Sequence, residues 1–379
     1  MRLSRVLLIG VLAVSGSSVY TARAQDVGVW RTAYVDRATM GETRAPAGVS
    51  RGPTWLPFGG TKVRFYAMHC YGAHTVVHLD KITLAKAADG TKMDGAVTAP
   101  AFAITFSGKE SFTLAKTDPD QVPSDDVSVP VTEGLWYVQE SCQKDSKTPY
   151  SFDNDGGFFA DSHESPAPSK SDTGRVGTTF RIDVLTTDTR PSIACYGDSI
   201  TASSGATKRR HIRYPDLLGK KLGLPTINLG VNGSTTQYLN GYYIRALAGV
   251  DVAVIQIGSN DIRGGWVKSL ADYIKYATPI CKGTQGKDGK IKVVWATILP
   301  GFLNNPDQEA LRQQINAWIR GNSMGADAIV DFDKALADPN NPAKTLAEYK
   351  REDGHPNDAG DAVLATAAAA VIQKLLAKP

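Results

Sequence analysis

Four short polar segments in the second half of the chain hold residue types that could carry out acyl chemistry. They cover residues 197–199, 228–233, 258–261 and 353–357. A serine hydroxyl is a weak nucleophile until a base takes its proton, and histidine suits that task near neutral pH. The negative oxygen that forms on an attacked carbonyl needs fixed N–H donors, such as backbone amides or an asparagine side chain. Each segment alone is typical of a turn, but their order and placement together indicate one site.

The elements that must position these segments form an alternating pattern from residue 191 onward. Nearly continuous apolar runs predict strands at 193–196, 226–229, 250–257, 292–299 and 328–332. Such runs are typical of strands buried on both faces. Apolar residues spaced three and four apart predict helices at 305–320 and 358–377. The pattern therefore predicts a three-layer α/β/α domain with a parallel sheet, whose ligands bind at the carboxyl ends of the strands.

The first half of the chain has a different pattern. Short runs rich in Val, Thr, Tyr and Phe predict strands at 61–68, 75–84, 101–106, 111–114, 127–131, 135–140 and 178–185. Several alternate apolar and polar residues, which predicts an antiparallel β-sandwich, jelly-roll-like, ahead of the α/β domain. Residues 150–176 are rich in Gly, Ser, Asp and Pro, and we interpret them as a flexible surface excursion or as a loop over the neighbouring active site.

The four polar segments resemble the signature blocks of the SGNH (GDSL) hydrolase family, which is named for a Ser, a Gly, an Asn and a His. Ser199 matches the nucleophile, Gly233 the glycine, Asn260 the asparagine and His355 the general base. The resemblance implies an ester hydrolase that forms an acyl-enzyme. It also implies that the backbone N–H groups of Ser199 and Gly233 and the side-chain amide of Asn260 hold the oxyanion.

The likeness has a defined extent. It covers most of residues 192–379, and residues 53–142 resemble more loosely the β-sandwich that precedes this domain in some bacterial members, through Gly60-Thr61-Lys62-Val63-Arg64 and Pro123-Ser124-Asp125-Asp126-Val127. It implies no organic cofactor and no metal. We interpret Asp198 and Asp261 as structural residues that bond to nearby loop amides.

The acid partner of the histidine departs from the family pattern. The family places an aspartate three residues before its histidine, whereas Asp353 lies two residues before His355 and Glu352 occupies the third position. One missing residue shifts an extended chain by about 3.3 Å and turns the next side chain to the other side. We favour Asp353 as the orienting acid, with Glu352 as the alternative; a third possibility is that neither reaches the ring.

Two other patterns could carry chemistry but have simpler explanations. Residues 321–325 match G-x-S-x-G, which needs a strand before it and a helix after it, whereas here a helix precedes and a strand follows. We predict an ordinary loop there. His69, His74 and His78 lie close together in the chain, but their spacing fits no metal-site signature.

The N-terminus predicts export. Residues 1–24 combine Arg2 and Arg5, an apolar run and the small-x-small sequence Ala22-Arg23-Ala24, which is typical of a cleavable signal peptide. Its removal takes three arginines and no acid, so the formal net charge of +4 falls to about +1. We therefore expect no nucleic-acid partner, no transmembrane segment, and a secreted or periplasmic protein with domains at 25–190 and 191–379.

Export also favours disulfide bonds between cysteines. The chain has four cysteines, and of the three possible pairings we favour Cys70 with Cys142, because both lie on predicted strands of the first half.

The substrate is predicted only as a class, a small-molecule or carbohydrate ester. Aromatic residues expected near the motif-bearing strand ends suit sugar rings, although packing is the commoner role of such residues. They are Tyr238, Tyr242, Tyr243, Trp266 and Phe302. The alternatives to an acyl or acetyl ester hydrolase are an acyltransferase on the same machinery and a non-catalytic carbohydrate-binding protein on a degenerate scaffold.

Overall fold

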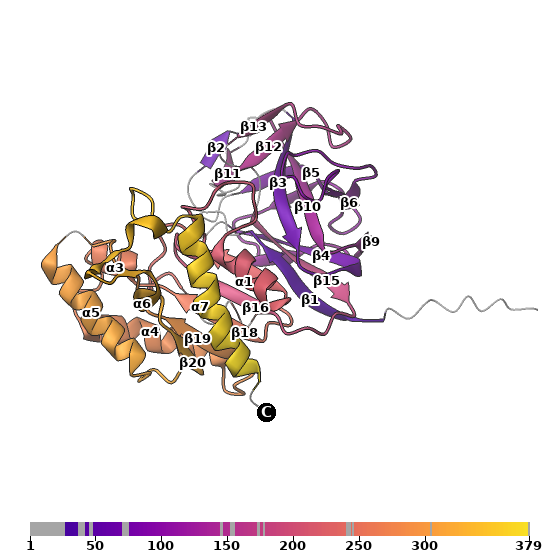
Figure 1. Cartoon of the computed structure of the whole chain (residues 1–379). Coiled ribbons are helices and arrows are strands. Elements are labelled where there is room, and N and C mark those ends of the chain that lie inside the picture. Colours follow the sequence, from indigo (N-terminus) through magenta and orange to yellow (C-terminus); the bar gives the residue numbers. More distant parts are fainter. Residues whose placement is uncertain are drawn as a thin grey trace, which may run out of the picture.

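The computed structural model describes residues 27–36, 42–44, 48–69, 76–144, 147–151, 156–172, 175–176, 179–239, 244, 246–303 and 305–377. Antiparallel sheets are followed along the chain by a parallel sheet with helices (Figure 1). The predicted fold class is therefore confirmed. The predicted signal peptide and Cys70 lie outside the described residues, so export and the favoured disulfide stay predictions.

Two antiparallel sheets make the sandwich. One has the strand order β1-β15-β4-β8 with β9 also on β4, and the other has β13-β12-β3-β10-β5-β6 with β7 also on β5. A small third sheet has the order β14-β11-β2. The strands are β1 (Val29–Val35), β2 (Glu42–Arg44), β3 (Val49–Leu56), β4 (Gly60–Met68), β5 (Val77–Lys86), β6 (Phe102–Ile104), β7 (Phe112–Leu114), β8 (Gln121–Pro123), β9 (Val127–Val131), β10 (Gly134–Cys142), β11 (Lys147–Ser151), β12 (Gly157–Ala160), β13 (Lys170–Asp172), β14 (Arg175–Val176) and β15 (Thr179–Thr186).

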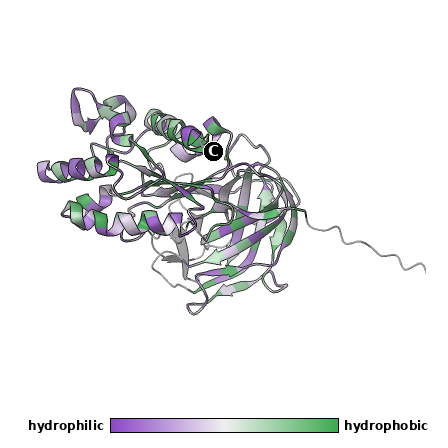
Figure 2. Ribbon diagram, turned by 90° about the horizontal axis from the view of Figure 1, so that it is seen from below, coloured by the Kyte–Doolittle hydropathy of each residue, from purple (hydrophilic) through white to green (hydrophobic). Residues whose placement is uncertain are grey.

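The sandwich core follows from alternation along the strands. In β4, Val63, Phe65 and Ala67 are buried, and the residues between them are only partly buried. Phe65 lies opposite Ile182 of β15 in the antiparallel register. These side chains share one apolar cluster with residues of the facing sheet, such as Val138. Hydrophobic and hydrophilic residues accordingly alternate along these strands (Figure 2).

The interpretation of residues 150–176 as a surface excursion was wrong for residues 157–160, which form β12, whereas most of residues 161–171 are exposed or partly exposed. All four residues of β12 are buried, and β12 pairs with β3 inside the larger sheet. The physical reason is Phe158, whose ring lies edge-on to Tyr137 at 5.9 Å between centroids. Two adjacent phenylalanines bury enough apolar surface to make a strand from a segment whose composition otherwise favours a loop.

The second part of the chain contains a five-stranded parallel sheet with the order β17-β16-β18-β19-β20. Its strands and the elements around it are β16 (Ile193–Gly197), α1 (Tyr214–Leu222), β17 (Thr226–Gly230), β18 (Val252–Gln256), α3 (Ser259–Arg263), α4 (Leu270–Gln285), β19 (Lys292–Ala296), α5 (Pro306–Arg320), β20 (Ala328–Val330), α6 (Phe332–Leu336), β21 (Ala337–Asp338), β22 (Asn341–Thr345), the 3-10 helix η1 (Ala347–Tyr349) and α7 (Asp358–Leu376).

Both faces of the parallel sheet are covered by helices, as the apolar runs predict. In β16, Ala194 and Tyr196 belong to the apolar cluster that includes α4 and α5. Ile193 and Cys195 belong to the cluster on the other face, which includes α1, α6 and α7. Successive side chains of one strand thus enter two separate cores, which gives the three layers seen in Figure 1.

Among the described residues, α7 is the one helix long and apolar enough to cross a membrane. Its Leu364, Ala368 and Ile372 are fully buried in the cluster that faces the sheet. The side chain of Asn357 caps its first turn by accepting a hydrogen bond from the N–H of Gly360 at 3.0 Å. We therefore interpret α7 as a core helix.

The sandwich and the α/β part contact each other through buried and partly buried groups. Arg31 of β1 donates hydrogen bonds to the carbonyls of Asp188 at 2.8 Å and Arg190 at 2.7 Å, in the segment that joins the two parts. Trp55 of β3 stacks on His211, with 4.1 Å between the ring centroids. His211 belongs to the loop that follows Ser199, so the sandwich supports the loop of the predicted nucleophile.

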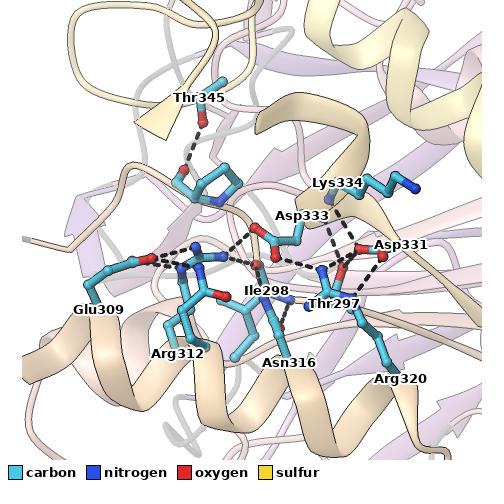
Figure 3. A network of polar contacts seen from close by, with 12 residues as sticks. Thr297, Ile298, Glu309, Arg312, Asn316, Arg320, Asp331, Asp333, Lys334 and Thr345 are labelled. Atoms are coloured by element: carbon cyan, nitrogen blue, oxygen red, sulfur yellow. Dashed lines mark hydrogen bonds and ion pairs between the residues drawn. The ribbon is translucent and has the colours of Figure 1, made fainter. Parts of the chain in front are cut away.

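A buried polar network fixes the loop after β19 (Figure 3). Arg312 of α5 is fully buried and pairs with Glu309 at 2.6 Å and Asp333 at 2.5 Å. The same guanidinium donates to the carbonyl of Ile298, and the Asn316 side chain both donates to that carbonyl and accepts from the Ile298 N–H, each at 2.8 to 2.9 Å. A loop held at both its amide and its carbonyl has little freedom to move.

Candidate active site

Ser199 and His355 meet at hydrogen-bond distance. Ser199 lies in the turn after β16, and His355 lies in the loop before α7, 156 residues later. The Oγ of Ser199 is 2.9 Å from Nε2 of His355. Both side chains are half-buried. Phe302, from the loop after β19, places its ring edge-to-face with the imidazole at 5.2 Å between centroids. The serine therefore has a base within reach of its proton.

The two loops are held together by groups other than the reacting ones. Ser203 donates a buried hydrogen bond to the Asp361 carboxyl at 3.0 Å, and Asp358 accepts from the N–H and the hydroxyl of Thr207, both at 2.7 Å. A Cβ at Gly205 would lie 2.0 Å from the Pro356 carbonyl. A side chain at that position would therefore push the His355 loop away from Ser199.

The predicted oxyanion donors lie around the same point. Gly233 has φ +75°, and a Cβ there would meet no atom within 4 Å. This left-handed conformation favours glycine. The Asn260 amide donates one hydrogen bond to the Ser234 carbonyl at 3.0 Å. That bond fixes the amide, whose second N–H is left for a substrate oxygen. Ser199, Gly233 and Asn260 all line one pocket.

The acid partner of His355 is more exposed to solvent than the serine. The Oδ1 of Asp353 is 3.4 Å from Nδ1 of His355, and 52% of the Asp353 side chain is exposed. The same oxygen accepts a hydrogen bond from the His355 backbone N–H at 3.1 Å. Burial alone would raise the pKa of Asp353, but this N–H and the nearby ring lower it overall. The Glu352 side chain is exposed, with no contact to the ring among the described residues, so the geometry favours Asp353.

Asp198 and Asp261 lie in the interior beneath the pocket. Oδ1 of Asp198 accepts from the Ile200 N–H at 2.9 Å, and Oδ1 of Asp261 accepts from the Thr236 N–H at 2.9 Å. Both carboxyls are fully buried. Burial, with a smaller contribution from the nearby Asp261 charge, raises the pKa of Asp198 to about 7, and burial also raises the pKa of Asp261. The bonds to loop amides agree with their interpretation as structural residues.

The site opens into a pocket of about 340 Å³. It is lined by Asp198, Ser199, Ile200, Ser204, Asn232, Gly233, Ser259, Asn260, Arg263, Phe302 and His355. Sequence reasoning missed Ser204 and Arg263. Arg263 lies three residues after Asn260 on α3, so a helix starting at the third motif would have placed both on one face. Ser204 carries no sequence signal of its own.

The predicted aromatic residues fall into three groups. Phe302 lines the pocket. Tyr238 and Trp266 are 52% and 61% exposed, on the loops that follow Gly233 and Asn260. Tyr242 and Tyr243 lie outside the described residues.

The G-x-S-x-G match and the three neighbouring histidines form no catalytic or metal site among the described residues. Residues 321–325 form turns between α5 and β20, which is the loop that we predict. His74 lies outside the described residues, and no group of three potential metal ligands is found within them.

A parallel sheet covered on both faces, with a pocket at the carboxyl ends of its strands, defines the class of the second domain as a three-layer α/β/α domain with a candidate hydrolytic site. Residues 195–363 match the model of the GDSL-like Lipase/Acylhydrolase family. The resemblance to the GDSL family that the sequence motifs indicate is therefore confirmed over this part of the chain. A comparison with curated proteins gives no match.

Several solved structures are similar to the chain. A member of the lipolytic protein G-D-S-L family from Veillonella parvula is 18% identical, with a TM-score of 0.40, over 48% of this chain and 98% of that one. A family two carbohydrate esterase from Clostridium thermocellum, in complex with cellohexaose, is 13% identical, with a TM-score of 0.41, over 92% of this chain and 99% of that one. A family two carbohydrate esterase from Cellvibrio japonicus is 13% identical, with a TM-score of 0.39, over 92% of this chain and 95% of that one.

Proposed function

We propose that the chain is a secreted or periplasmic carboxylic-ester hydrolase that removes acyl or acetyl groups, with a carbohydrate as the carrier of the ester. The observation that carries the proposal is the 2.9 Å separation of Ser199 Oγ and His355 Nε2 at the mouth of a pocket that also holds Gly233 and Asn260. This arrangement brings a nucleophile, a base and oxyanion donors to one point.

The geometry supports the following reaction. His355 takes the proton of Ser199 as its oxygen attacks the ester carbonyl, and the new oxyanion receives hydrogen bonds from the N–H groups of Ser199 and Gly233 and from the Asn260 amide. The protonated imidazole, stabilised by Asp353, then gives its proton to the departing alkoxide. A water molecule repeats the sequence on the acyl-enzyme and releases the acid.

The carbohydrate part of the proposal is supported by the character of the pocket and its surroundings. Ser204 donates to the Asn232 amide oxygen at 2.8 Å inside the pocket, so the wall offers hydroxyl and amide groups. The exposed rings of Tyr238 and Trp266 lie on the loops that follow the oxyanion donors Gly233 and Asn260 along the chain. Polar groups that bind hydroxyls and aromatic faces that cover a ring are the two elements of sugar binding.

Ser199→Ala tests the proposal, with Ser323→Ala in the G-x-S-x-G loop as the matched control. We expect the first variant to lose roughly 10⁴-fold or more of the hydrolysis of an aryl acetate, together with covalent labelling by a fluorophosphonate. The control should keep both. Full activity in folded Ser199→Ala would contradict the mechanism, and transfer of the acyl group to added alcohol or sugar in preference to water would make the protein an acyltransferase. Absence of both labelling and hydrolysis in the native protein would favour a binding protein.

Export has a separate test. The N-terminus of the protein recovered outside the cytoplasm should lie at or near Gln25. Recovery of the full chain from the cytoplasm alone would contradict the proposed location.

A further inference from the structure

One exposed charged side chain, that of Arg263, lines the pocket. Of the charged residues in its wall, Asp198 is fully buried, whereas the Arg263 side chain is exposed to solvent. Arg263 ends α3, one helical turn after Asn260. Side chains three residues apart lie on the same face of a helix. The guanidinium is therefore on the pocket side of α3, next to the amide that is predicted to hold the oxyanion.

The Arg263 side chain has no hydrogen-bond or ion-pair partner among the described residues, although it lines a pocket that contains polar groups. Arg64, Arg181 and Arg320, by contrast, pair with carboxylates at 2.6 to 3.0 Å. A guanidinium presents a planar set of N–H donors that matches a carboxylate, so one left unpaired at a pocket is suited to an anionic ligand.

An aromatic face lies beside the same residue. A Cβ at Gly264, which directly follows Arg263, would be 2.7 Å from Nε1 and 2.8 Å from Cδ1 of the Trp266 ring. The indole therefore lies against the backbone at the end of α3. It is 61% exposed, and among the described residues only Val27 is a more exposed large apolar side chain. A sugar ring can stack on such a face while a group attached to it reaches the neighbouring cation.

We propose that Arg263 and Trp266 form the subsite for an anionic sugar, so that the preferred substrate is an O-acyl hexuronic acid residue. The uronate carboxylate binds the Arg263 guanidinium, the sugar ring covers Trp266, and the acyl group enters the pocket towards Ser199. A volume of about 340 Å³ lies at the small end of ligand pockets, which fits a short acyl group such as acetyl. This inference rests on the proposed function, because it names the substrate class of that site.

The test uses a pair of substrates that differ only in charge: O-acetylated glucuronic acid and O-acetylated glucuronamide. The native enzyme should cleave the acid with a kcat/KM roughly threefold to fivefold above the amide, because an ion pair at an exposed site has at most about that effect. The preference should shrink as salt is added, since exposed charges are screened. Arg263→Gln should abolish the preference through a higher KM for the acid, and its effect on the hydrolysis of 4-nitrophenyl acetate should be smaller than its effect on the acid.

Two further variants complete the test. Lys268→Gln removes the same unit charge from an exposed residue of the loop that follows α3 and does not line the pocket, and it should keep the preference. Trp266→Ala should weaken the hydrolysis of both sugar esters by a similar factor. Equal rates for the acid and the amide in the native enzyme would overturn the inference, as would an equal loss for all three esters in Arg263→Gln. Failure of the native enzyme to cleave any ester would instead remove the proposed function itself.

Discussion

The two nitrogen atoms of the His355 ring have different surroundings. Nε2 lies 2.9 Å from a half-buried serine whose loop is connected to α7 by the buried hydrogen bond between Ser203 and Asp361. Nδ1 lies 3.4 Å from Asp353, whose side chain is 52% exposed and is positioned by the His355 backbone N–H. Electrostatic interactions weaken as water reaches them. The comparison indicates that catalysis depends more on the serine and oxyanion side of the ring than on its acid side.

The largest effect within this comparison is expected on the oxyanion side, from Asn260→Ala. The amide is held by the Ser234 carbonyl, so it needs no rearrangement to bind the oxyanion. Its removal should lower kcat by roughly 10²–10³-fold with little change in KM, since the bond forms in the transition state. Steady-state kinetics on an acetyl ester would measure this. A loss confined to KM would show that the amide binds the ground state instead.

The buried carboxyls beneath the oxyanion side should make stability depend on pH. Folded Asp198 keeps its proton up to about pH 7, whereas an unfolded chain releases it near pH 3.8. Between these values the folded state binds more protons, so this residue's contribution to the free energy of unfolding is full below pH 3.8 and is lost as pH rises towards 7. In Asp198→Asn the free energy of unfolding should therefore fall by a few kcal/mol less between pH 4 and pH 7 than in the native protein. Denaturant unfolding across this pH range would measure the difference.

The matched control for this measurement is Asp120→Asn, which changes an exposed carboxyl of the sandwich. Its unfolding free energy should follow the native protein across the same range of pH. The raised pKa values of Asp261 and Asp361 act in the same direction and persist in both variants. A native-like pH dependence in Asp198→Asn would contradict the assignment of a protonated Asp198.

The smallest effect is expected on the acid side, from Asp353→Asn. Replacing the buried triad acid of a serine protease costs about 10⁴ in turnover. The exposed Asp353 should contribute far less, and we expect a loss of roughly tenfold. Glu352→Gln should have no measurable effect on kcat. A larger loss of kcat in the Glu352 variant would show that Glu352, and not Asp353, orients the His355 ring. Equal, negligible losses of kcat would mean that neither acid orients the ring.

Much of the fold was predictable because it depends on local patterns. The continuous apolar runs at β16, β18 and β19 require burial on both faces, and Asn305 and Asn357 are helix caps that can be recognised in the sequence. The strand β12 was not predictable, because its two phenylalanines are flanked by Gly, Ser and Pro and gain their burial only against β3 and Tyr137. Ser204 was missed because only the packing of distant loops places it in the pocket, and Arg263 was missed because the short helix α3 was not predicted.

The sequence by itself determined the class of chemistry. Ser199, Gly233, Asn260 and His355 are chemical types in a fixed order, and that order survives any change in the loops between them. Only the tertiary structure decided how close the serine and histidine lie, that Asp353 and not Glu352 faces the ring, and that Arg263 stands without a partner at the pocket. These are distances between residues brought together by packing, and packing is a property of the whole folded chain.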